Sequence, residues 1–213
     1  MAQFQRTGGL MNQVPSPLNP GARARLEPQI QSIYDHQVIT GTQANPVNFF
    51  SQGFTNGRST RETNVPVFPL PSPVVFLVAG FGVHLVQPAP ANAVFVLTVV
   101  SDLNHLLYNG VLSFTVGMQG KGYLVGNLYQ FPAGLGQYGF MTTDGATAAN
   151  VAHLTGNGVP AIGNYFRIKG APITLTQNET FLAQIGFLGS SAAMSSSHTL
   201  AIILRGVQGK QIG

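Results

Sequence analysis

From residue 65 onward, short apolar runs rich in Val and Phe alternate with Gly, Pro and Asn. Eight such runs occupy residues 74–86, 93–100, 111–117, 123–129, 162–169, 173–176, 181–187 and 198–205. β-Branched and aromatic residues are enriched in strands, and Gly, Pro and Asn mark the turns between them. No helical periodicity separates the runs, and strands without intervening helices favour antiparallel sheets. We therefore expect an all-β fold, specifically a single jelly-roll β-sandwich of about eight antiparallel strands.

The connections between these runs are predicted from their turn residues. Asn109-Gly110 is a strong hairpin signal and leads into the run at 111–117. The glycines that follow, around Lys121, lack the G-x-x-x-x-G-K-[ST] order that cradles a phosphate, so they predict a strand connection. Residues 131–160, rich in glycine, predict a long loop region in which Tyr138 and Phe140 are candidate exposed aromatics.

The first 64 residues have a different composition, which is rich in Gln, Asn, Pro and Gly. Their one helical candidate is Gly21 to Ile33, which Pro28 interrupts unless a helix begins there. A structureless stretch of this length is unusual inside a compact monomer. We expect residues 1–64 to form an extended N-terminal arm with at most a short helix, followed by the β-domain at 65–213.

Charge is scarce in this chain. Only 8% of the 213 residues are Asp, Glu, Lys or Arg, whereas 44% are hydrophobic. Soluble domains carry about 25% charged residues, and their mixed charges keep copies apart. The most apolar run, at 74–86, is shorter than the roughly 20 residues of a spanning helix, so a membrane span is not expected. The scarcity of charge predicts an exterior covered by other subunits.

Residues that could carry chemistry are few and scattered. The chain has no Cys and five His, and none of the histidines falls in a metal-ligand spacing. His84, alone in its run, is expected to be a core or edge residue. Asp102 and His105 are either an acid–base pair or an Asx-type turn at a strand end; we favour the turn because no nucleophile motif accompanies them. No cofactor, metal or catalytic residue is expected.

Basic residues gather before residue 65. They are Arg6, Arg23, Arg25, Arg58 and Arg61. One interpretation is contact with nucleic acid or anionic lipid inside a particle. The other is pairing with carbonyls and carboxylates of adjoining subunits, which we prefer because dispersed arginines give a weak electrostatic footprint.

The pattern resembles the jelly-roll capsid proteins of small tailless icosahedral bacteriophages. The segments that carry the resemblance are RETNVP (61–66), FPL (68–70), VVFLVAGFGVHLV (74–86), NGVLSFTVG (109–117), GYL (122–124), FPAG (131–134) and APITLTQNETF (171–181). In that family one or two jelly rolls stand in the shell, and N-terminal arms tie subunits together or approach an inner membrane. This chain is long enough for one jelly roll only, which departs from the double-barrel members and leaves both major and minor capsid roles open.

We expect a non-enzymatic structural protein of the virion, made in the host cytoplasm because no signal peptide is visible. Its partners are copies of itself and other capsid proteins, with weak contact of the arm to packaged nucleic acid or an inner membrane. A phage spike, fibre or carbohydrate-binding β-sandwich remains an alternative, with Tyr138 and Phe140 at a loop tip. A β-sandwich hydrolase is a further alternative that requires carboxylates or histidines to cluster in space, and a wide separation of Asp102, Asp144 and Glu179 would remove it.

Overall fold

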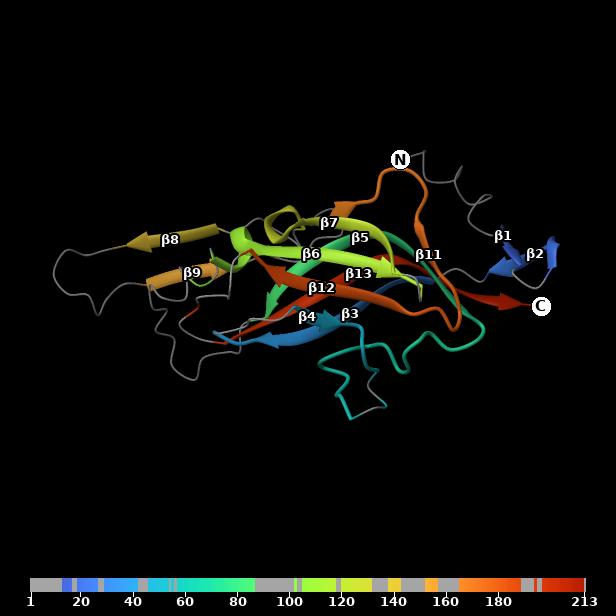
Figure 1. The fold of residues 1–213 in the computed structure, drawn as a ribbon, viewed down its shortest axis with the longest axis horizontal. Coiled ribbons are helices and arrows are strands. Elements are labelled where there is room, and N and C mark those ends of the chain that lie inside the picture. The colour runs from blue at the N-terminus through green and yellow to red at the C-terminus, as the bar shows by residue number, and fades with distance from the viewer. Residues whose placement is uncertain are drawn as a thin grey trace.

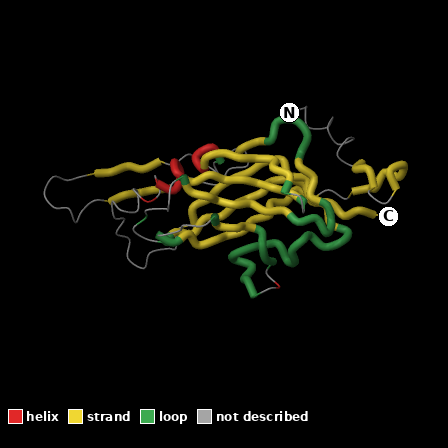
Figure 2. The backbone as a smooth tube through the Cα atoms, in the orientation of Figure 1, coloured by secondary structure: helices red, strands yellow, loops and turns green. Residues whose placement is uncertain are grey.

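The computed structural model describes fourteen segments of the chain. They are residues 13–16, 19–26, 29–41, 46–53, 55, 57–86, 102, 105–117, 120–131, 138–142, 152–156, 165–188, 194 and 197–212. For residues 13–16, 19–26, 85–86, 138–142, 152–156 and 210–212 the description is of the backbone alone. The described chain is all-β with antiparallel sheets, as predicted, and short helical segments lie near the start of β6 (Figures 1 and 2).

The strands occupy these bounds: β1 Gln13–Ser16, β2 Asn19–Leu26, β3 Gln29–Ile39, β4 Val47–Phe49, β5 Val74–Val86, β6 Gly110–Val116, β7 Lys121–Asn127, β8 Tyr138–Thr142, β9 Ala152–Gly156, β10 Phe166–Arg167, β11 Ile173–Leu175, β12 Phe181–Phe187 and β13 His198–Ile212. A 3₁₀ turn, η2, covers Leu128–Gln130.

The first sheet is built around β13. This strand pairs antiparallel with β3 on one side and β5 on the other, and β10 and β11 both pair with β5. Near its C-terminal end β13 also pairs with β2, which pairs in turn with β1. The β1–β2 hairpin therefore lies beyond one end of the body, beside the C-terminus (Figure 1).

The second sheet has the order β4-β12-β6-β7, and all of its pairs are antiparallel. A separate hairpin of β8 and β9 extends from the opposite end of the molecule to β1 and β2 (Figure 1). Tyr138 and Phe140 lie in β8, within the region predicted as loop; their side chains fall outside the described residues.

One apolar core fills the space between the two main sheets. Burial alternates along β6 and along the first part of β12, so that every second side chain points inward, as expected for strands with one buried face. Phe81 of the first sheet meets Phe114 of the second edge to face, with ring centroids 4.9 Å apart. Phe114, Phe181 and Phe50 continue this aromatic layer. Aromatic pairs of this kind stabilise a core beyond their buried area.

The segment before β6 differs from the prediction. Residues 105–109 are helical, and β6 begins at Gly110 and pairs with β7 and β12. The hairpin predicted at Asn109-Gly110 is therefore wrong, because these residues join a helix to a strand. A Cβ on Gly110 would lie 2.5 Å from Leu106 O, so the close approach of helix and strand requires glycine there. Among the described residues no helix is long and apolar enough to cross a membrane.

Several predicted strands coincide with observed ones. The runs at 74–86 and 181–187 match β5 and β12 to the residue, and the run at 111–117 matches β6 within one. The run at 93–100 lies outside the described residues. The predicted connection after β6 is the β6–β7 turn, where Gly117 and Gly120 have φ of 81° and 62°.

Residues 29–64 differ from the expected arm. The helical candidate at 21–33 is instead part of strands β2 and β3, and β3 pairs with β13 over its whole length. Ile33, Ile39, Phe49 and Phe50 are buried in the core. The polar composition of this region predicted an arm rather than a strand because side chains alternate along β3, with one face in the core and the other on the outside of the sheet.

Candidate functional site

The outer face of the second sheet carries no charged side chain on its two central strands. β6 and β12 present Ser, Thr, Gln and aliphatic residues, flanked by β4 and β7. The residues of this surface, which we call the neutral face, are Asn48, Ser113, Thr115, Val125, Leu182 and Gln184. Val125 is 73% exposed, and Gln184 Nε2 donates to Asn48 Oδ1 at 2.8 Å. A broad uncharged sheet face is suited to contact with another protein surface.

The buried carboxylate Asp35 on β3 is the centre of a polar cluster at the edge of the first sheet. Its Oδ2 accepts from Phe50 N at 2.6 Å, and its Oδ1 accepts from the Arg58 guanidinium, which also donates to His36 O. Burial raises the pKa of Asp35, and the hydrogen bond from Phe50 together with the charge of Arg58 opposes that rise. The cluster ties the segment around Arg58 to the edge of β3.

Arg58 therefore has a partner within its own chain, which differs from the expected contact with adjoining subunits. Its side chain is only 12% exposed. Arg61 is exposed, the side chains of Arg23 and Arg25 on β2 are not described, and Arg6 lies outside the described residues.

A second buried pair joins Asp102 to the first residue of β13. Asp102 Oδ2 lies 3.0 Å from His198 Nε2, and both residues are buried. Asp102 is helical rather than part of a turn that ends a strand, and His105 Nδ1 lies 2.9 Å from Asn109 Nδ2. Nothing in the sequence pointed to His198 as a partner, since 96 positions separate it from Asp102.

Of the other two carboxylates considered for a hydrolase, Asp144 and Glu179, the structure describes Glu179. Glu179 lies in the turn before β12, where its Oε2 accepts from Thr176 N and Thr176 Oγ1. Asp144 lies outside the described residues. Within the described segments, no three His, Cys, Asp or Glu side chains group closely enough to hold a metal ion.

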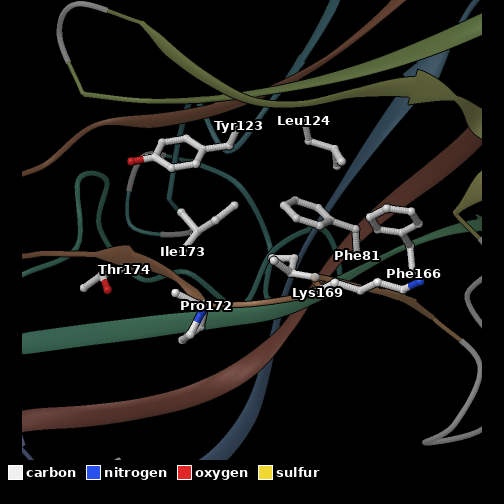
Figure 3. A pocket seen from close by; sticks show the side chains of 10 residues that line it. Phe81, Tyr123, Leu124, Phe166, Lys169, Pro172, Ile173 and Thr174 are labelled. Carbon is white, nitrogen blue, oxygen red and sulfur yellow. The ribbon is translucent and has the colours of Figure 1, made fainter.

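A pocket of about 500 Å³ opens between β7 and the segment that carries β10 and β11 (Figure 3). Tyr123 and Leu124 line it from the second sheet, and Phe81, Phe166 and Ile173 line it from the first. Its polar groups include the Tyr123 hydroxyl and the Lys169 ammonium, and none of the described carboxylates lines it. This pocket offers an apolar volume without an acid–base pair.

His84, expected as a core or edge residue, lies half-buried on the outer face of the first sheet. It shares a row with His36 of β3, because both pair with Ala201 of the intervening β13. Burial lowers the pKa of His84, and burial is also the main cause of the lowered pKa of His36. His84 Nδ1 is buried and makes no hydrogen bond within the described residues.

Comparison with known protein families, with curated proteins and with solved structures finds no match to this chain.

Proposed function

We propose that this chain is a structural virion protein whose single jelly-roll subunit assembles with copies of itself into an icosahedral shell. The order of the strands carries the proposal. Of the strands in the described part of the chain, leaving aside the short β10 and the hairpins β1–β2 and β8–β9, eight remain: β3, β4, β5, β6, β7, β11, β12 and β13.

These eight strands pair as a nested series. The first strand, β3, pairs with the last, β13, and the second, β4, pairs with the seventh, β12. The third, β5, pairs with the sixth, β11, and the fourth and fifth, β6 and β7, form the innermost hairpin. All four pairs are antiparallel. A long hairpin folded over in this way into two sheets is the wrapping of a jelly roll, an architecture of viral capsid domains that lectins and cupins share.

The neutral face supports the proposal that this chain is a subunit of an assembly rather than a monomer. Monomeric proteins remain soluble through charged surface, yet the central strands of this sheet present none, and Val125 is 73% exposed. Interfaces between subunits are depleted of Lys, Glu and Asp relative to the rest of a protein surface. We assign the neutral face to contact between subunits.

The proposal is tested by the size of the native assembly. We expect the purified full chain to form closed particles of uniform diameter, measured by multi-angle light scattering and seen by electron microscopy. A discrete trimer would instead support the spike or fibre alternative. A stable monomer at high protein concentration would overturn both.

A further inference from the structure

Two arginines lie in one row across the outer face of the first sheet. Arg205 of β13 and Arg167 of β10 both pair with Gly80 of the strand between them, β5. Directly paired residues on antiparallel strands point to the same face, and neighbouring strands lie about 4.8 Å apart, so the two arginines begin roughly 10 Å from each other. We call Arg205, Gly80, Arg167 and the adjacent Tyr165 the arginine row.

Tyr165 lies between the two guanidinium groups. The Cζ atoms of Arg167 and of Arg205 are each 5.4 Å from the centroid of its ring. The ring rests on Gly80, because a Cβ on that glycine would be 2.2 Å from Tyr165 Cδ2. The absence of a side chain at Gly80 therefore leaves the space that Tyr165 fills, and Tyr165 in turn holds both guanidinium groups by cation–π contact.

The carboxylates of the described residues are committed elsewhere. Asp35 pairs with Arg58 and Asp102 with His198. The other two accept local hydrogen bonds within their own turns, Glu62 from Ser59 and Glu179 from Thr176. Within the described residues neither arginine of the row has an ion-pair partner, and Arg205 Nε is buried without a hydrogen-bond acceptor.

We propose that the arginine row binds the phosphate backbone of nucleic acid. A guanidinium donates two parallel hydrogen bonds to phosphate oxygens, and two of them fixed by one ring present a prearranged pair of phosphate contacts. Because Tyr165 is engaged in cation–π contacts with both arginines, we expect the row to read no base and binding to be independent of sequence.

Nucleic acid is favoured over a membrane by the composition of the row itself. Its members across the four strands, Ser32, Arg205, Gly80 and Arg167, include no large apolar side chain that could enter a bilayer. The exposed Ile30 lies one row away, paired with Val207. Nucleic-acid binding is a function beyond the proposed shell and is compatible with it. The arginine row and the neutral face lie on opposite outer faces, so one face of the subunit can contact packaged nucleic acid while the other contacts a neighbouring subunit.

The test measures binding of a fluorescein-labelled single-stranded oligothymidine by fluorescence anisotropy over a series of salt concentrations. We expect the wild-type chain to bind, and the double variant R167Q/R205Q to bind more weakly. Its slope of log K against log salt should be shallower by about 1.4, since each phosphate contact on a single strand contributes about 0.7. K121Q is the matched control: Lys121 also makes a cation–π contact, with Tyr123 on the other sheet, and its loss should leave the slope unchanged.

Three results would overturn the proposal: no binding by the wild-type chain, equal slopes for the wild type and the double variant, or an equal change in K121Q. The single variant R167Q, at an exposed position, keeps the test valid if the double variant unfolds. Vesicles containing phosphatidylglycerol form a second arm, and loss of vesicle binding in R167Q/R205Q with unchanged oligonucleotide binding would assign the row to lipid. Particle formation is scored separately by light scattering, so failure of the shell proposal and failure of this one are distinguishable.

Discussion

At the scale of the residue, we expect the buried pair of Asp35 and Arg58 to make a large contribution to the stability of the fold. Asp35 is fully buried, and its two oxygens bind the backbone of Phe50 and the side chain of Arg58. In D35N the Arg58 charge loses its counter-charge while remaining mostly buried. We expect the free energy of unfolding, measured by urea titration, to fall by about 3–5 kcal/mol.

The double variant D35N/R58M is the control for this pair. Removing both charges leaves no uncompensated ion, so the double variant should be more stable than D35N alone. If D35N/R58M lost as much stability as the sum of the two single variants, the coupling between Asp35 and Arg58 would be absent and the assignment incorrect.

His36 and His84, which share a row on the outer face of the first sheet, predict a dependence of stability on pH. Burial lowers the pKa of His36 and of His84 below the ordinary value of 6.5. A histidine of this kind binds protons more readily in the unfolded chain, so stability falls as the pH drops below 6.5 toward the folded-state pKa. The groups around His36 are Asp35, Arg58, Glu62 and His84.

We expect urea titrations to give a lower free energy of unfolding at about pH 5 than at about pH 7. In H84N this fall should be smaller, because one of the two groups that gain protons on unfolding is gone. An identical fall in H84N and the wild type would show that His84 does not contribute to it.

At the scale of the element, the pairing of β13 with β5 depends on a glycine. The register shifts between Arg205 and Gly206, and a Cβ on Gly206 would lie 2.0 Å from Leu77 O, a backbone atom that cannot move aside cheaply. We expect G206A to lower the free energy of unfolding by about 1–3 kcal/mol, as overpacking does.

Gly186 of β12 is the matched control, since an added Cβ there meets nothing within 4 Å. We expect G186A to change stability by no more than about 0.5 kcal/mol. Equal effects of the two substitutions would indicate that loss of glycine flexibility in a strand, rather than the contact with Leu77, sets the cost.

The sequence predicts the strands whose pattern is locally strong. β5 is rich in Val, Phe and Leu and lies between proline-containing segments, and burial in β12 alternates from Phe181 to Ile185. Both are predicted to the residue because β-branched and aromatic residues are enriched in strands and turn residues bound them. β3 was missed because its buried face includes the charged Asp35 and its outer face is polar, so its membership of the sheet depends on pairing with β13.

The candidate surfaces were predictable only in part. The scarcity of charge predicts contact with another protein, but which face is neutral depends on the alternation of β6 and β12. Arg167 and Arg205 are 38 positions apart and share a row through the registers of β10 and β13 on β5. Pairings over such separations leave no local signal in one sequence.

At the scale of the whole molecule, the two outer faces can be tested against each other. Val125 on the neutral face and Val38 on the first sheet are both exposed, by 73% and 57%. In V125K a desolvated ammonium would enter the proposed contact between subunits. We expect this variant to remain folded, with stability within about 0.5 kcal/mol of the wild type, but to lose closed particles in light scattering.

V38K adds the same charge to the opposite face, where we expect particles to form as in the wild type. Particles from V125K that matched those of the wild type would exclude the neutral face from the assembly contact. Loss of particles in both variants would point instead to a general effect of added charge.

The position of β13 has a consequence for synthesis of the chain. This strand follows every other strand, yet it lies in the middle of its sheet, between β3 and β5. While a ribosome still holds residues 198–212, the facing edges of β3 and β5 have no partner, and open edges of this kind invite pairing with other chains. The first sheet is complete only after translation has passed β13, so nascent chains on one polysome are at risk of mispairing until then.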